Sequence, residues 1–208
     1  MIIQWCVKGL ALENDQEARD VIDSSCGICC NWWRRVGRIS PSWIRGKLTP
    51  QNLDLHINHF TTPDPTTGNP FNTDTPFISL SGGTVERDTA AQTNIVHRAR
   101  MTALWFGTDF GRRDQCYLYL CWVVVAPRRA VGIEGVAEEP RDLNTYRRYS
   151  AYQTEGEITA KVLIPDNQIM GCEKWEWDQS VNTLRRAWLH PNPRFTPPEM
   201  LSNVRELI

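Results

Sequence analysis

The amino-acid sequence predicts a single α+β domain with flanking helices. Short β-prone runs, bounded by glycine and proline, occur in both halves of the chain. One longer segment with helical periodicity lies between them. The chain has 208 residues, which is enough for one large domain with a well-buried core. Strands in both halves around one long helix are typical of α+β domains.

The first half of the chain contains one short helix and two predicted strands. Residues 12–22 place apolar side chains near helical spacing, and the pattern stops at Ser-Ser-Cys-Gly. Residues 28–37, ICCNWWRRVG, are apolar and β-prone and end in glycine, so we predict a strand there. Residues 61–76 are rich in proline and threonine and predict a loop. Residues 77–81, FISLS, alternate in polarity and predict the second strand.

The second half contains the long helix and three further predicted strands. Residues 84–107 repeat apolar side chains at helical spacing and end at a glycine. Residues 115–127, QCYLYLCWVVVAP, form the longest β-prone run, and because it is apolar on both faces we predict a central buried strand. Residues 156–165 and 168–178 predict the last two strands. The proline-rich tail, residues 189–208, is predicted to end in a short helix.

The charge balance gives no reason to expect general affinity for polyanions. The chain carries 23 basic and 24 acidic residues, for a net charge of -1. This balance does not rule out a basic face on one side of the protein. No run reaches the ~18 apolar residues that a membrane span needs. The N-terminus lacks the basic and apolar regions of a signal peptide. We therefore expect no membrane partner and a site of action in the cytosol, either bacterial or host.

The seven cysteines favour thiols over disulfides or a metal site. Cys26 and Cys29 have the C-x-x-C spacing of a zinc site, but no second ligand pair follows at a suitable distance. The adjacent pair Cys29 and Cys30, together with the odd total, is unlike the disulfide framework of a secreted domain. We therefore expect no bound metal.

Two acids stand side by side where a polar loop turns into a strand. In a strand, Glu155 and Glu157 would point to the same face with their Cα atoms roughly 6–7 Å apart. Two carboxylates at this distance repel, so the pair favours a cation, a shared ligand or a bound proton. The alternative is a solvated strand edge on which charges discourage aggregation.

The order of these motifs resembles the mono-ADP-ribosyltransferase toxins of the arginine, Ser-x-Ser, Glu-x-Glu class, which include the catalytic subunits of cholera and pertussis toxins. The matching segments, in chain order, are WWRRVGR, PFISLSGG, VVVAP, TEGEI and IPDNQIMGCEKW. The resemblance covers roughly residues 30–177. Within one domain, 1–208, we expect residues 1–29 to form a helical N-terminal extension and residues 178–208 a proline-rich C-terminal extension.

The resemblance implies a fold, a substrate and roles for the two acids. The expected fold has two roughly perpendicular antiparallel sheets that enclose a cleft for NAD. Glu157 would stabilise the positive charge that develops on the ribose when nicotinamide leaves, as a carboxylate does in glycoside hydrolysis. Glu155 would orient or deprotonate the incoming nucleophile.

The resemblance also implies a role for each serine of the Ser-x-Ser motif. Ser79 would hydrogen-bond the catalytic glutamate, and Ser81 would support the nicotinamide pocket. The family often has threonine between them, whereas this chain has Leu80. The alternative is a half-exposed strand with small polar side chains on its outer face.

The family places an arginine on its first strand, after an aromatic residue, where the guanidinium binds a phosphate of NAD. Arg34 follows Trp33 and fits this pattern slightly better, whereas Arg35 fits better the spacing to Pro41. Neighbouring strand residues face opposite ways, so only one of the two arginines would serve. The alternative is a basic cluster on the surface.

The loop before the two acids is expected to recognise the target. Tyr149 and Tyr152 lie there, and family members often carry an aromatic residue that touches the target. The four histidines show no shared spacing and are interpreted as structural.

The implied function is an NAD-dependent mono-ADP-ribosyltransferase, a toxin or effector, with protein arginine favoured as the target. One alternative is a relative that modifies nucleic-acid bases, for which the tyrosine- and arginine-rich loop would supply stacking and phosphate contacts. Another is a binding module without enzymatic activity. An antitoxin or immunity protein is expected as a partner of a toxin.

Overall fold

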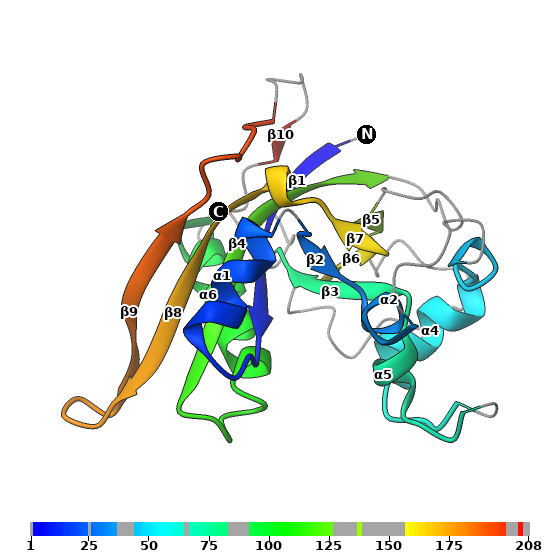
Figure 1. The fold of residues 1–208 in the computed structure, drawn as a ribbon, viewed down its shortest axis with the longest axis horizontal. Coiled ribbons are helices and arrows are strands. Elements are labelled where there is room, and N and C mark those ends of the chain that lie inside the picture. Colours follow the sequence, from blue (N-terminus) through cyan, green and yellow to red (C-terminus); the bar gives the residue numbers. More distant parts are fainter. Residues whose placement is uncertain are drawn as a thin grey trace.

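Two β-sheets form the framework of the protein in a computed structural model (Figure 1). The structure describes residues 2–24, 26–36, 44–64, 67–82, 92–126, 137–138, 157–198 and 204–205. The larger, mostly antiparallel sheet has eight strands in the order β10-β1-β3-β6-β5-β4-β8-β9, and β2 and β7 form the smaller sheet. The strands of the larger sheet are β1 (Ile2–Leu10), β3 (Phe77–Ser81), β4 (Gln115–Ala126), β5 (Ala137–Glu138), β6 (Glu157–Lys161), β8 (Ile169–Asp178), β9 (Thr183–Pro191) and β10 (Val204–Arg205).

The strand β4 lies at the centre of the large sheet. It pairs antiparallel with β1 along the whole length of that strand, and with β8 on its other side. Tyr117, Leu118 and Tyr119 of β4 are completely or almost completely buried. The prediction of a central buried strand is therefore confirmed for residues 115–126, and Pro127 lies outside the described residues.

The strands β3 and β6 cross the direction of β8 and β9 (Figure 1). Their register pairs all five residues of each strand, from Phe77 with Lys161 to Ser81 with Glu157. In contrast, β3 meets β1 at one pair only, Val7 with Ser81. The large sheet therefore opens between β1 and β3, and this opening is where a cleft can form.

Two helices cover opposite faces of the sheet around β1 and β4. The helix α1 (Asp15–Asp23) buries Ala18 and Ile22 in the main core, and its N-cap Asn14 accepts a hydrogen bond from the Glu17 amide. The helix α6 (Gln92–Gly107) packs on the other face. It approaches β1 closely, because a Cβ atom on Gly9 would lie only 2.0 Å from the carbonyl oxygen of Ala103.

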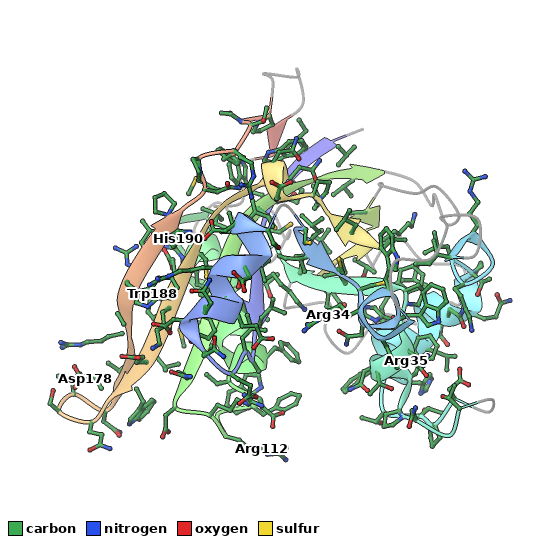
Figure 2. All side chains as sticks on the ribbon, in the orientation of Figure 1. Arg34, Arg35, Arg112, Asp178, Trp188 and His190 are labelled. Carbon is green, nitrogen blue, oxygen red and sulfur yellow. The ribbon has the colours of Figure 1, made fainter. Side chains whose placement is uncertain are left out.

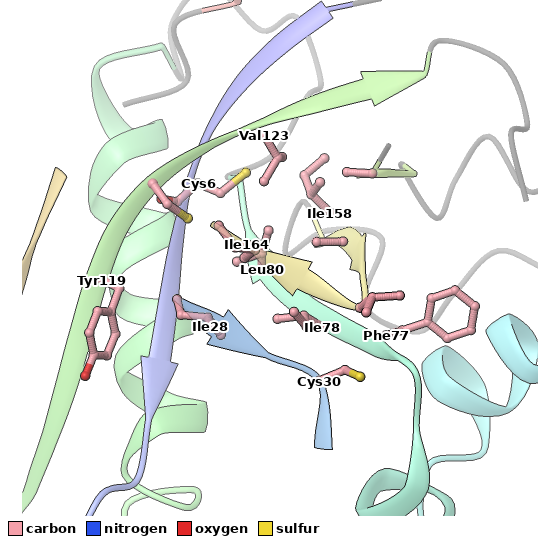
Figure 3. Close-up of a cluster of buried hydrophobic side chains, with 14 of the residues drawn as sticks. Cys6, Ile28, Cys30, Phe77, Ile78, Leu80, Tyr119, Val123, Ile158 and Ile164 are labelled. Carbon is pink, nitrogen blue, oxygen red and sulfur yellow. The ribbon is translucent and has the colours of Figure 1, made fainter. Parts of the chain in front are cut away.

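The remaining helices surround the smaller sheet, which consists of β2 (Ile28–Cys29) and β7 (Leu163–Ile164). They are α2 (Asn31–Val36), α4 (Pro50–Asn58) and α5 (Phe71–Asp74), together with the 3-10 turn η4 (Asp166–Gln168). The main core joins both sheets, as Figure 3 shows: Ile28 and Ile164 of the small sheet lie close to Leu80 and Ile158 of the large one. The burial of this shared core couples the two sheets into one folding unit.

The predicted α+β architecture is confirmed, and so are the short helix near residues 12–22 and the strands at 77–81 and 168–178. The predicted strand at 156–165 is present as two strands, β6 and β7, because Val162 has a left-handed backbone (φ +65°) that breaks the run. The predicted long helix corresponds to α6; its predicted first turns lie outside the described residues.

Four sequence-based expectations are wrong. Residues 61–76 are not all loop, because the helix α5 occupies Phe71–Asp74. Residues 28–37 are not one strand, because β2 ends at Cys29 and α2 begins at Asn31. Residues 1–29 are not a helical extension, since they include β1, which pairs with β4. Residues 178–208 are not simply a proline-rich extension with a terminal helix, since β9 pairs with β8 and β10 pairs with β1. Tertiary contacts outweigh local patterns in these segments.

All seven cysteines are described, and none of them forms a disulfide, so the prediction of thiols is confirmed. Within the described ranges, no three His, Cys, Asp or Glu side chains are arranged to hold a metal ion. None of the helices in these ranges is long and apolar enough to cross a membrane.

Candidate active site

A cleft of about 750 Å³ lies at the opening between β1 and β3. Its walls come from the end of β1, from α1, from the β2–α2 segment, from α4, from β3, from α6 and from the first residue of β6. A volume of this size is within the range of small-molecule and nucleotide sites. The cleft therefore collects residues that are far apart in the sequence, from Val7 to Glu157.

Ser79, Ser81 and Glu157 all line this cleft. Ser81 is the pairing partner of Glu157 across β3 and β6, so their side chains lie on the same side of the strand pair. Ser79 pairs with Thr159 in the same way. The structure thus brings together the Ser-x-Ser motif and the second acid, with Ser81 directly opposite Glu157.

Lys8 of β1 brings a positive charge into the cleft, and sequence analysis missed it. It follows Val7, which pairs with Ser81, so three adjoining strands carry Lys8, Ser81 and Glu157. Burial lowers the pKa of the Lys8 ammonium from 10.5 to about 8, and the attraction of the Glu157 carboxylate partly opposes this shift. At neutral pH, Lys8 is therefore a cation beside an acid.

His56 of α4 is held between two hydroxyl groups. The Thr75 hydroxyl lies 2.9 Å from its Nδ1 atom, and the Ser79 hydroxyl lies 2.9 Å from its Nε2 atom. Burial lowers the pKa of His56 from 6.5 to about 3, and the charge of Lys8 adds to this shift. The imidazole is therefore neutral at pH 7, with one nitrogen donating and the other accepting. The expectation that this histidine is merely structural misses its hydrogen bond to Ser79.

The buried, neutral His56 should make the protein sensitive to acid. Because its folded pKa lies below the unfolded value, the unfolded state takes up the proton, and stability is lost as the pH falls from 6.5 towards 3. By pH 4.5 the loss amounts to about 3 kcal/mol. Between pH 7 and pH 4.5, we expect the free energy of unfolding, measured in urea, to fall by about that much less in His56→Gln than in the wild type.

The control for this measurement is His190→Gln, because His190 lies near the surface with Asp23 as its partner. Equal losses in the wild type and in His56→Gln would show that other groups cause the acid sensitivity.

The two candidate arginines lie on the helix α2, not on a strand, so their side chains point in different directions around the helix axis. Arg34 lines the cleft, and its guanidinium lies 3.7 Å from Glu17 of α1. Arg35 forms an ion pair with the buried Asp74 of α5. Figure 2 shows this difference, with Arg34 on the side towards α1 and Arg35 close to α5.

Three predicted site residues lie outside the described residues: Glu155, Tyr149 and Tyr152. Their assigned roles remain predictions. The described end of this segment is Glu157, the first residue of β6.

Aromatic side chains form a further part of the wall of the cleft, and Trp33 is one of them. The indole N–H of Trp33 is buried and has no acceptor among the described residues. The wall also includes the rings of Phe60, Phe106 and Phe110. The described wall therefore combines basic, acidic and aromatic side chains, which suit a polar ligand that contains a ring system.

A sequence signal for Lys8 did exist. It is the only charged residue in an otherwise largely apolar, β-prone run, IIQWCVKGL. A buried strand carries such a charge where the charge has a task or a partner. His56 had no comparable signal, because its partner Ser79 lies 23 residues away in the sequence.

No family model and no curated protein matches the sequence. Among solved structures, the chain is similar to EcPltA, with 13% identity over 93% of this chain and 88% of that chain and a TM-score of 0.50. It also matches a mutant of the E. coli heat-labile enterotoxin, with 16% identity, coverage of 91% and 76% and a TM-score of 0.44. CARDS toxin matches with 13% identity, coverage of 98% and 30% and a TM-score of 0.38. The chain thus has a fold like that of the ADP-ribosyltransferase toxins.

Proposed function

We propose that this protein is an NAD-dependent mono-ADP-ribosyltransferase that acts as a toxin or effector on a macromolecular target in the cytosol. The observation that carries the proposal is the pairing of Glu157 with Ser81 in a cleft that also contains Lys8. The likeness in fold to EcPltA and the order of the sequence motifs support it.

The chemistry requires a carboxylate at the position where positive charge develops. The bond between nicotinamide and ribose breaks, its electron pair leaves with the neutral nicotinamide, and the ribose becomes an oxocarbenium-like cation. The Glu157 carboxylate stabilises this cation, and the nucleophile of the target then adds to the same carbon. Neutral His56 holds the Ser79 hydroxyl in a fixed direction at the wall of the site.

The diphosphate of NAD needs cations, and the cleft supplies two candidates. Lys8 lies in the wall beside Glu157, and Arg34 lies on α2 at another part of the same wall. Arg35 is the weaker candidate of the two neighbouring arginines, because it is not among the residues that line the cleft and it pairs with the buried Asp74. The contact of Arg34 with Glu17 is longer and more exposed. We assign the phosphate contacts to Lys8 and Arg34.

We favour protein arginine as the acceptor. Glu155 would serve as the additional base that a guanidinium nucleophile needs, and Tyr149 and Tyr152 would contact the target. Modification of nucleic-acid bases is the second candidate. A toxin of this kind also implies an antitoxin or immunity protein as its partner.

Release of nicotinamide from NAD by the purified chain tests this function. We expect slow hydrolysis without any added acceptor, because water can replace the target nucleophile, and we expect the rate to survive a strong chelator. The Glu157→Gln variant, measured in the same assay, gives the background rate of nicotinamide release. A folded wild-type chain that binds NAD but releases no nicotinamide would instead favour a binding module without enzymatic activity.

A further inference from the structure

An exposed apolar patch lies on α6 and the turn that follows it. Its members, which we call the aromatic patch, are Met101, Trp105, Phe106 and Phe110, with exposed fractions of 50%, 53%, 38% and 41%. Single exposed apolar side chains are ordinary, but a contiguous group of four large ones indicates an interaction site.

The turn after α6 holds the rings of this patch together. The Phe110 amide donates to the Trp105 carbonyl oxygen at 2.8 Å, and the Phe110 ring lies edge-on to Trp105 and Phe106, with centroids 6.0 and 5.4 Å away. This geometry requires left-handed backbone at Asp109 and Phe110, with φ of 51° and 60°. Bulky residues rarely adopt such angles, so the surrounding structure maintains an unfavourable conformation that fixes Phe110 beside the helix.

The aromatic patch is continuous with the cleft. Phe106 and Phe110 belong both to the patch and to the wall of the cleft, whereas Trp105 and Met101 lie outside that wall. A molecule that contacts Trp105 and Met101 would therefore lie at the entrance of the proposed NAD site.

Among the described side chains, the two arginines in the turn after α6 are both paired with acids, which favours a protein over a polyanion as the ligand of the patch. Arg112 pairs with Asp109 at 3.5 Å, and Arg113 pairs with Glu13 at 3.1 Å. Nucleic acids and anionic membranes require unneutralised cations. Exposed Trp, Phe and Met, by contrast, are the residues enriched at the centres of protein–protein interfaces.

We propose that the aromatic patch is the docking surface for a protein target, which places an apolar side chain on Trp105 and Met101 while its acceptor side chain enters the cleft. This inference rests on the proposed transferase function. It goes beyond that function by separating target binding, on α6, from NAD chemistry, on β3 and β6.

The test compares two reactions of the same variants. Trp105→Ala and Met101→Ser remove exposed side chains outside the wall of the cleft. The matched control is Trp177→Ala, an exposed tryptophan of β8; Figure 2 shows its neighbour Asp178 at the β8–β9 hairpin, apart from Arg112 in the turn after α6. The readouts are nicotinamide release from NAD alone and incorporation of labelled ADP-ribose from NAD into the proteins of a cell lysate.

We expect Trp105→Ala to lower protein labelling by about tenfold or more, as for an interface hot spot, while hydrolysis of NAD changes less than twofold. Met101→Ser should have a smaller effect in the same direction, and Trp177→Ala should match the wild type in both reactions. Equal labelling by Trp105→Ala and the wild type would overturn the docking proposal. Labelling found only in nuclease-sensitive material would also overturn it, because the target would then be a nucleic acid. A wild-type dimer that Trp105→Ala converts to monomers would overturn it as well, because the patch would then bind a second copy of the chain.

A loss of hydrolysis together with labelling in Trp105→Ala would also overturn the proposal, because it would show a defect in the cleft. Failure of the underlying function gives a different result, since the wild type itself would then release no nicotinamide.

Discussion

Replacement of Glu157 by glutamine is expected to lower both ADP-ribose transfer and NAD hydrolysis by a factor on the order of 10²–10³. The substitution keeps the size of the side chain and most of its hydrogen-bonding capacity, but it removes the charge that opposes the ribose cation. The affinity for NAD should change little, because the charge matters most in the transition state. The measurements are kcat for both reactions, NAD binding and thermal unfolding.

Substitutions of two other glutamates are compared with Glu157→Gln in the same assays. Glu155→Gln should suppress transfer to the target but spare part of the hydrolysis, since water needs less help from a base than a guanidinium does. Glu176→Gln changes an exposed acid of β8 that pairs with Lys174, and it should leave both reactions unchanged. Near-normal hydrolysis by a folded Glu157→Gln variant would contradict the assignment and would favour the solvated strand edge.

Replacement of Lys8 by methionine is expected to lower kcat/KM for NAD by roughly 10- to 100-fold, the cost of one charge-assisted hydrogen bond. Methionine keeps the length and the apolar stem of the side chain, so the fold should persist. Lys8→Arg should retain most of the activity, because it preserves the positive charge. Lys47→Met, at an exposed turn, is the matched control and should have no effect.

The same lysine predicts an alkaline limit for the wild type. The ammonium with a pKa of about 8 is charged below that pH and neutral above it, so kcat/KM should fall as the pH rises through about 8. Arginine stays protonated to a much higher pH, so Lys8→Arg should lack this fall. Unfolding would not explain the fall. Between pH 8 and 10.5 the unfolded state keeps the Lys8 proton that the folded state has lost, so the contribution of Lys8 to the free energy of unfolding increases as the pH rises. A wild-type profile that stays flat to pH 9.5 would contradict a phosphate-binding role for Lys8.

The sequence by itself determined the elements whose patterns are strong and local. The apolar run at 115–127 was long enough to identify β4, and the alternation at 77–81 identified β3 together with its two serines. The spacing of Glu157 before its strand was also visible, which is why its position at the start of β6 could be predicted. These features depend on residues that are close together in the chain.

Other features were decided only by the tertiary structure. The short segment after Cys29 has no clear hydrophobic periodicity. Its helical state therefore depended on packing against α5 and on the pairing of Arg35 with Asp74. The polar strand β9 is a strand because it pairs with β8 at the edge of the sheet. Local propensity is too weak to settle such segments when tertiary contacts compete with it.

The composition of the candidate site depended on the tertiary structure most of all. Lys8, Ser81 and Glu157 are widely separated in the sequence, and they meet because Val7 pairs with Ser81 and Ser81 pairs with Glu157. A shift of one residue in the pairing of β3 with β6 would place Ser81 and Glu157 on opposite faces of the sheet. Local patterns reveal that a strand exists but not which strand lies beside it, so the place of Lys8 in the same cleft as Ser81 and Glu157 became visible only when the sheet was assembled.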